Sequence, residues 1–146
     1  MLTATTLKDL PLGFRLTEDQ QLIKETVREL AQAEFAPRAA EVDRNHRFPR
    51  ENWDLLAQSD LCGLPFPEEY GGAGMDHVSY STVVEELGSA CATTSVLYSA
   101  HVSLCATPIY IFGTEEQKKR FLPPMCQGKK LGAFALSEPD SGSDSA

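Results

Sequence analysis

Residues 87–114 contain no Asp, Glu, Lys or Arg, and this interval restricts the possible folds more than any other feature of the chain. An apolar run of this length predicts either a membrane span or a helix buried in protein. Ser, Thr, His and Pro recur throughout the interval and are too frequent for a lipid-exposed span. We therefore expect one or two helices that are surrounded by protein on most sides, and no membrane partner.

An amphipathic helix is predicted ahead of this interval. Thr17 and Gln20 have the spacing of a capping box, and acidic residues occupy the first turn. From residue 22 to residue 42 apolar side chains recur at three- and four-residue steps. Pro37 should bend or break this helix near Phe35, because proline lacks a backbone N–H.

A second helix and an irregular connector should follow. Pro49 suits the first turn of a helix that extends to about Ser59, and Gly63 can close it. Residues 64–75 include two prolines and three glycines, which predict a connector without regular structure. His46 has no partner at metal-ligand spacing, so we expect a solvated loop residue.

Two further helices are marked by their capping residues. Asp76 should cap a helix that ends near Gly88. Residues 114–117 form a second capping box, and the helix that they open should stop at Pro123 and Pro124. With the helices of the apolar interval, these elements predict an all-α fold.

The apolar interval also contains candidate binding residues. Large apolar and small residues alternate around Tyr98 and His101, which predicts either close helix packing or a cavity. His101 and Cys105 stand four residues apart and face the same way, but two ligands do not make a metal site. We expect a satisfied core histidine and no bound metal.

The pattern changes after the last helix. Residues 131–136 are apolar without a helical period, which predicts a strand. Ser137, Ser141 and Ser143 then offer donors, and Gly142 permits close backbone approach, so a phosphate or a flavin edge could bind here. Composition alone favours a Gly/Ser turn. Since a lone strand needs partners, the chain reads as a helical domain followed by the start of a β domain.

Composition limits the partners and the compartment. The formal net charge of −8 argues against a nucleic-acid surface and a polybasic membrane anchor. The four cysteines show no CxxC spacing, which favours buried thiols in a reducing compartment over disulfides. Residues 1–10 lack the features of a secretory signal or a transit peptide. We expect a bacterial cytoplasmic protein, or a mitochondrial matrix protein if the source is eukaryotic.

Four motifs together resemble one family. Leu-Ser-Glu-Pro-Asp-Ser-Gly-Ser-Asp at 136–144, preceded by Gly-Ala-Phe-Ala, resembles the flavin-contacting signature of acyl-CoA dehydrogenases. Residues 67–74, 84–88 and 112–118 resemble further motifs of that family, in the same order along the chain. The resemblance extends from about Leu16 onward. Within the family, the chain resembles the short-chain, butyryl-type members most.

The resemblance implies a function and a set of site residues. It implies a FAD enzyme that oxidises an acyl-CoA to the trans-2-enoyl-CoA, passes electrons to an electron-transferring flavoprotein and forms a homotetramer when complete. It implies no catalytic residue in this chain, because the family's carboxylate base lies in the C-terminal domain. The residues that it places at FAD are Phe134, Ala135, Leu136, Ser137, Glu138, Pro139, Asp140, Ser141, Gly142 and Ser143. Those that it places at the acyl-CoA are Ser143, Leu97, Tyr98 and His101.

The expected organisation follows from both lines of reasoning. Residues 1–15 form a leader, 16–127 form the N-terminal helical domain and 128–146 begin the middle β domain. We expect the chain alone to be catalytically inactive. Two alternatives stay open: a related flavoprotein oxidase on the same scaffold, and a non-catalytic helical interaction module.

Overall fold

The computed structural model describes residues 15–144, so the predicted leader lies almost wholly outside the described residues. The described part is helical and contains no strand, which confirms the all-α class. Its helices are α1 (Glu18–Leu30), α2 (Ala36–Arg44), α3 (Arg50–Gln58), α4 (His77–Ala90), α5 (Ala92–Ser99), α6 (Thr107–Phe112) and α7 (Glu115–Cys126). Turns of π-helix at Ala31–Phe35 and Ala100–Ala106 and of 3-10 helix at Leu61–Gly63 and Glu68–Tyr70 complete the helical elements.

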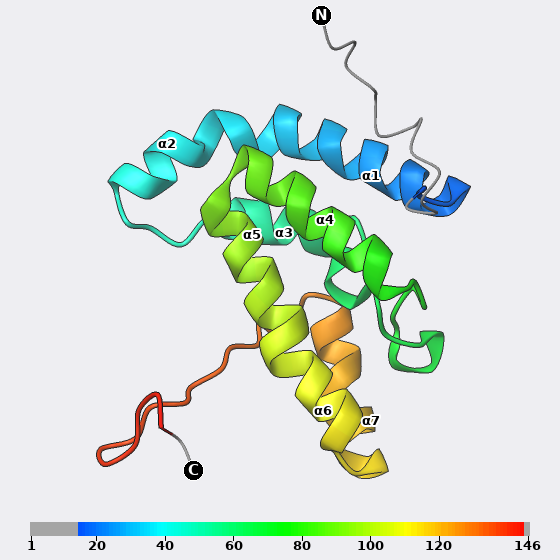
Figure 1. Ribbon diagram of the computed structural model, residues 1–146, viewed down its shortest axis with the longest axis vertical. Coiled ribbons are helices and arrows are strands. Elements are labelled where there is room, and N and C mark those ends of the chain that lie inside the picture. The colour runs from blue at the N-terminus through cyan, green and yellow to red at the C-terminus, as the bar shows by residue number, and fades with distance from the viewer. Residues whose placement is uncertain (1–14, 145–146) are drawn as a thin grey trace, which may run out of the picture.

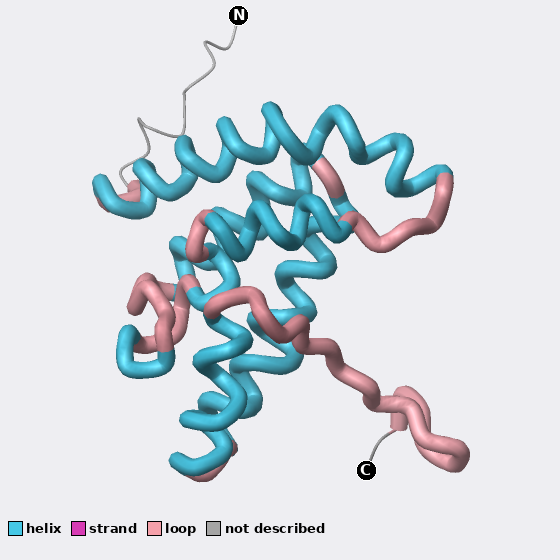
Figure 2. Tube along the Cα trace, turned by 180° about the vertical axis from the view of Figure 1, so that it is seen from behind, coloured by secondary structure: helices cyan, strands magenta, loops and turns pink. Residues whose placement is uncertain are grey.

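The helices are arranged as an arch over a descending pair. Helices α1 and α2 form the arch, with α1 lying alongside α4, while α5 and α6 continue as one long helix beside α7 (Figure 1). Figure 2 shows the same body from behind, with the C-terminal segment extending away from it. Helix α4 packs on both α1 and α5, so the core lies where these helices meet α3 and α7. The largest side chains buried there are those of Trp53, Tyr98, Phe35, Phe66, Leu56, Leu87 and Leu122.

The predicted helix starts are confirmed. The Thr17 hydroxyl accepts a hydrogen bond from the Gln20 backbone N–H at 3.2 Å, and the Gln20 side chain accepts one from the Thr17 N–H at 2.9 Å. Thr114 and Gln117 repeat this reciprocal pair at α7. Asp76 caps α4 by accepting from the Ser79 N–H at 2.8 Å. The free N–H groups of each first turn are thereby partly satisfied.

Pro37 does not interrupt the first helix. The π-helical turn Ala31–Phe35 lies immediately before it, and α2 then continues with the proline in its first turn. A π-helical turn has a wider hydrogen-bonding pattern than the α-helix, so the proline ring and the absent N–H are accommodated there. The irregularity falls near Phe35 as the sequence predicts, but the helix is not broken.

Pro123 and Pro124 do not stop α7, and that prediction was wrong. The helix continues through both prolines to Cys126. Proline fixes a φ that is compatible with a helix, so its cost is the lost hydrogen bond and ring crowding. Leu122, Met125 and Cys126 are buried on either side of the pair, and this burial offsets the cost.

Gly63 does not close the second helix either. Helix α3 ends at Gln58, and Asp60 makes the left-handed turn with φ of 55°. Gly63 instead belongs to a 3-10 turn that lies against α7. A Cβ atom at this glycine would stand 2.6 Å from the Cβ atom of Cys126, so the position permits close approach of the two segments.

Most of the apolar interval forms one helix of 21 residues, Ala92–Phe112, with a mean hydropathy of 1.3 in its most apolar window, and residues 87–90 end α4. By length and composition this helix could cross a membrane. One such helix in a chain is only weak evidence of a membrane span. Only 28% of that window is buried, so the expectation of protein on most sides was wrong for this chain. Val96, Leu104 and Ile111 are exposed on it, and Phe112 is 84% exposed.

Two ion pairs, both formed by Glu86, join the arch to the helix beneath it. The Glu86 carboxylate on α4 accepts two hydrogen bonds from Arg28 on α1, from Nε at 2.9 Å and from Nη2 at 2.7 Å. The Glu86 side chain is only 5% exposed, and Lys24 Nζ lies 3.6 Å from it. The Arg28 guanidinium therefore holds the pKa of Glu86 below its usual range.

Glu86→Gln should lower the free energy of unfolding by about 2 kcal/mol at neutral pH, because a partly buried charge-assisted pair is replaced by weaker bonds. Since the pKa of Glu86 is lower in the folded protein, the pair stabilises above pH 4.5 and its contribution is lost as the pH falls. Urea unfolding of the original chain and of Glu86→Gln at pH 7 and pH 4 measures the difference in the free energy of unfolding. Asp54→Asn, at an exposed pair with Arg50, is the matched control and should change little. Equal effects of the two substitutions would contradict the prediction.

Candidate functional site

The predicted flavin-contacting segment lies outside the helical body. Residues 133–140 are all exposed, and the predicted strand at 131–136 does not form in the described chain. A strand needs a neighbour for its backbone hydrogen bonds, and no described segment supplies one. The only regular feature is a turn in which Glu138 and Ser141 exchange backbone hydrogen bonds of 2.8 and 3.2 Å.

The donor set of this segment fits an oxygen-rich group such as FAD. Ser137 and Ser143 are exposed residues, and each carries a hydroxyl and a backbone N–H. A Cβ atom at Gly142 would meet no atom within 4 Å, so the backbone there is open to a ligand. Glu138 and Asp140 bring negative charge, which favours a flavin edge over a bare phosphate. The residues present therefore fit the predicted flavin contact, and the assignment stays a prediction.

The two groups of predicted site residues are not brought together. The segment carrying residues 134–143 runs away from the helices, whereas Leu97, Tyr98 and His101 lie on the long helix (Figure 1). Leu97 is half-buried. Tyr98 is fully buried, and its hydroxyl donates to the Leu61 carbonyl at 3.1 Å. Burial raises the pKa of Tyr98. In this chain Tyr98 has a packing role, and the substrate assignment stays a prediction.

His101 is also fully buried. Its Nδ1 accepts a hydrogen bond from the Gly132 backbone N–H at 2.9 Å, so the neutral ring carries its proton on Nε2. Nε2 makes no hydrogen bond of good geometry, although the backbone carbonyls of Met125 and Cys62 lie near enough to act on the ring. Burial lowers the pKa of His101 to about 4, although the backbone carbonyls of Met125 and Cys62 oppose the shift. The prediction that His101 lies in the core is confirmed, but only its Nδ1 makes a well-formed hydrogen bond.

The cysteines show neither metal nor disulfide chemistry. All four are free, and Cys62, Cys91 and Cys126 are buried. Burial raises the pKa of Cys62 to about 12 and that of Cys126 to about 11, so both are protonated, weakly nucleophilic thiols at neutral pH. Within residues 15–144 no group of three or more His, Cys, Asp and Glu side chains is placed to hold a metal ion.

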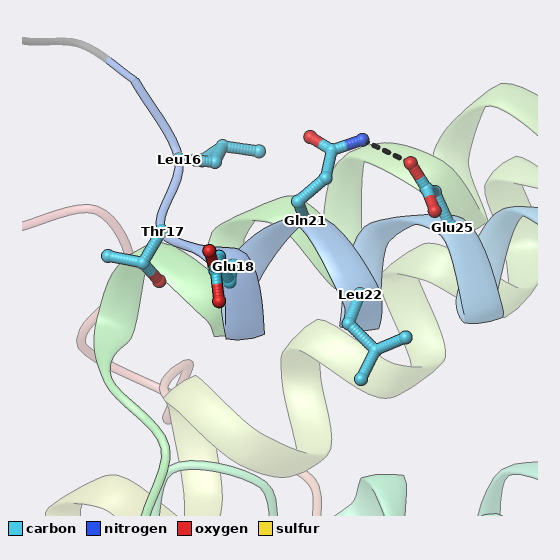
Figure 3. A pocket seen from close by; sticks show the side chains of 6 residues that line it. All are labelled: Leu16, Thr17, Glu18, Gln21, Leu22 and Glu25. Carbon is cyan, nitrogen blue, oxygen red and sulfur yellow. Dashed lines mark hydrogen bonds between the residues drawn. The ribbon is translucent and has the colours of Figure 1, made fainter.

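Two surface hollows lie away from these residues. One, of about 430 Å³, is an open depression at the start of α1 between Leu16, Glu18 and Leu22 (Figure 3). Its rim carries Glu25, whose carboxylate accepts from the Gln21 amide at 2.6 Å. The other, of about 370 Å³, is an apolar groove between α6 and α7. It is lined by Pro108, Ile109, Phe112, Gly113, Gln117 and Phe121.

Comparison with known proteins identifies the family. Residues 17–129 match the family model described as acyl-CoA dehydrogenase, N-terminal domain. The chain belongs to the acyl-CoA dehydrogenase family. Its expected likeness to short-chain and butyryl-type members is confirmed by the relatives found.

Three members illustrate this likeness. The short-chain specific acyl-CoA dehydrogenase of Clostridium acetobutylicum is 50% identical over 92% of this chain and 35% of its own length. The structure of butyryl-CoA dehydrogenase from Megasphaera elsdenii is 41% identical, with a TM-score of 0.85 over 92% of this chain and 36% of that one. An acyl-CoA dehydrogenase complexed with FAD from Bacillus anthracis is 36% identical, with a TM-score of 0.81 over 89% of this chain and 22% of that one. The chain thus spans about a third of the curated relative's length.

Sequence reasoning missed the link between His101 and Gly132. Their separation of 31 residues carries no local pattern, and the backbone N–H of a glycine is invisible to side-chain motifs. A weak signal was present, since Gly132 begins the Gly-Ala-Phe-Ala run just ahead of the flavin signature. The structure therefore gives His101, which was predicted to lie at the acyl-CoA, a contact with Gly132, two residues before the candidate segment.

His101 should make stability depend on pH. The unfolded chain takes up the proton near pH 6.5 and the folded chain only near pH 4, so stability is full above pH 6.5 and falls as the solution is acidified. The expected loss between these values is about 3 kcal/mol. Urea unfolding at pH 7 and pH 5 should show a smaller difference for His101→Asn than for the original chain. His77→Gln, at an exposed position, is the control, and equal pH dependence in all three proteins would contradict the assignment.

Proposed function

We propose that this chain is the N-terminal helical part of a FAD-dependent dehydrogenase that converts a short-chain acyl-CoA to its trans-2-enoyl-CoA. The observation that carries the proposal is the family match over residues 17–129, together with 50% identity to a relative named as short-chain specific. The open segment at 134–143, with the exposed residues Ser137 and Ser143, supports a flavin as the group held there.

The chain's own residues would bind and orient, while the chemistry comes from elsewhere. FAD, when bound, would accept a hydride from the β-carbon of the thioester as a carboxylate outside this chain takes the α-proton. Ser137 and the neighbouring backbone N–H groups would face the isoalloxazine edge, and Ser143 would face the CoA side. The helical body would support this segment, and the half-buried Leu97 would approach the acyl chain.

The partners and the setting of the complete protein are part of the same proposal. An electron-transferring flavoprotein would accept the electrons, and a homotetramer would form. The apolar residues left exposed on the helix Ala92–Phe112 support burial by further protein. The compartment would be the bacterial cytoplasm, or the mitochondrial matrix in a eukaryote.

The chain alone should bind no stoichiometric FAD and show no turnover, because it supplies one wall of the site and no catalytic base. Purified chain mixed with FAD is passed over a desalting column, and its visible spectrum and its turnover of butyryl-CoA with an artificial acceptor are recorded. Flavin retained at one equivalent together with turnover would overturn the claim of inactivity.

A completed enzyme tests the reaction itself. The chain is joined to the remaining two thirds of the Clostridium acetobutylicum relative, in place of that protein's own N-terminal part. We expect this completed enzyme to bind FAD and to oxidise butyryl-CoA with an electron-transferring flavoprotein as acceptor. Hydrogen peroxide formed at the rate of enoyl-CoA formation would instead indicate an oxidase. A folded, FAD-free product would indicate a non-catalytic interaction module.

A further inference from the structure

A short connector links α7 to the candidate flavin segment, and it is fixed at both ends. At its start the Trp53 indole N–H donates to the Gly128 carbonyl at 2.9 Å. At its end the Gly132 N–H donates to Nδ1 of His101 at 2.9 Å. Both hydrogen bonds are buried, and the two aromatic rings contact each other edge to face with centroids 4.8 Å apart. One aromatic pair therefore holds both ends of residues 128–132.

The two glycines of the connector sit in slots that admit no side chain. A Cβ atom at Gly128 would lie 2.3 Å from the Cβ atom of Ala57, and the residue has a φ of 67°. A Cβ atom at Gly132 would lie 2.6 Å from Cε of Met125 and 2.7 Å from Sγ of Cys105. Close packing thus limits the movement of the connector, and Gly132 is the last buried residue before the exposed segment.

His101 is a costly residue for a core position. Its Nε2 is buried near the Met125 and Cys62 carbonyls but makes no hydrogen bond of good geometry with them, and burying a poorly paired polar group is unfavourable. A leucine would fill the same space without that cost. Unlike a leucine, the histidine offers an acceptor for the Gly132 N–H. The need for an acceptor at this place, rather than core packing, explains why position 101 is a histidine.

We propose that His101 is a positioning residue, which fixes Gly132 and thereby the point and direction at which residues 134–143 leave the helical body toward the flavin. The inference rests on the proposed function. Ser137 lies five residues beyond Gly132, about 16 Å along an extended chain. In the described chain the hydrogen bonds beyond Gly132 join residues of the segment to one another. A loosened connector would therefore move the whole flavin-contacting segment.

A matched pair of substitutions separates positioning from packing. His101→Asn places an amide oxygen near the position of Nδ1 and keeps an acceptor for Gly132. His101→Leu keeps the apolar volume and removes the acceptor. A purely structural role predicts that the leucine variant behaves as well as or better than the asparagine variant. The positioning role predicts the opposite order.

The first measurement uses the full chain without any flavin. Hydrogen exchange at the Gly132 amide should become about tenfold faster in His101→Leu, because this variant loses one buried hydrogen bond. In His101→Asn the exchange rate should stay close to that of the original chain. Exchange in α1 is the internal control for global stability. If the leucine variant does not fold, His101→Gln replaces it, because its longer side chain carries the amide toward the Nε2 position. Unchanged Gly132 exchange in the variant without the acceptor would overturn the proposal.

The second measurement uses the completed enzyme described above. FAD affinity and the visible flavin spectrum should change in His101→Leu, with affinity about tenfold weaker, and should be restored in His101→Asn. If the enzyme with the original histidine binds no FAD, the proposed function fails and this inference fails with it. If all three proteins bind FAD equally and give the same spectrum, only the positioning role is overturned.

Discussion

The 21-residue helix from Ala92 to Phe112 is packed on one side only, and the rest of the structure depends on its packed side. Tyr98, His101, Val102 and Ala106 face inward and are buried. Through them the helix reaches the turn after α3, the connector after α7 and the helix α4 above it. The arch of α1 and α2 is held to this assembly mainly through α4, where Arg28 and Glu86 form a bidentate pair.

Local signals predicted the helices well, because their starts depend on residues close in sequence. Thr17, Asp76 and Thr114 cap helices as their spacing indicates, and the connector at 64–75 is irregular apart from one 3-10 turn. The predictions for Pro123, Pro124 and Gly63 failed for a common reason. Each treated a breaking residue as a stop, whereas the deciding interactions were contacts with segments distant in sequence, which local patterns do not encode.

The candidate site was predicted in part. The resemblance to a flavin signature at 134–143 is a sequence motif, so with the three other motifs it allowed the family to be inferred from the sequence. Its conformation could not, since a strand takes its shape from neighbouring strands and the described chain provides none. His101 was assigned to the acyl pocket by its place in the sequence. In the structure it contacts the backbone that leads into the flavin segment, a relation visible only in three dimensions.

The two π-helical turns share an arrangement: each is followed by a helix with proline in its first turn, at Pro37 and at Pro108. A π-helical turn accommodates about one residue more than an α-helical turn, and one residue corresponds to roughly 100° around the helix axis. Side chains before and after the turn Ala100–Ala106 therefore point in directions that differ from those of one continuous α-helix. A single-residue deletion there would rotate α6 relative to α5 and turn a different face of α6 toward α7. The length of this turn thus sets which surface the lower half of the long helix offers to the rest of the protein.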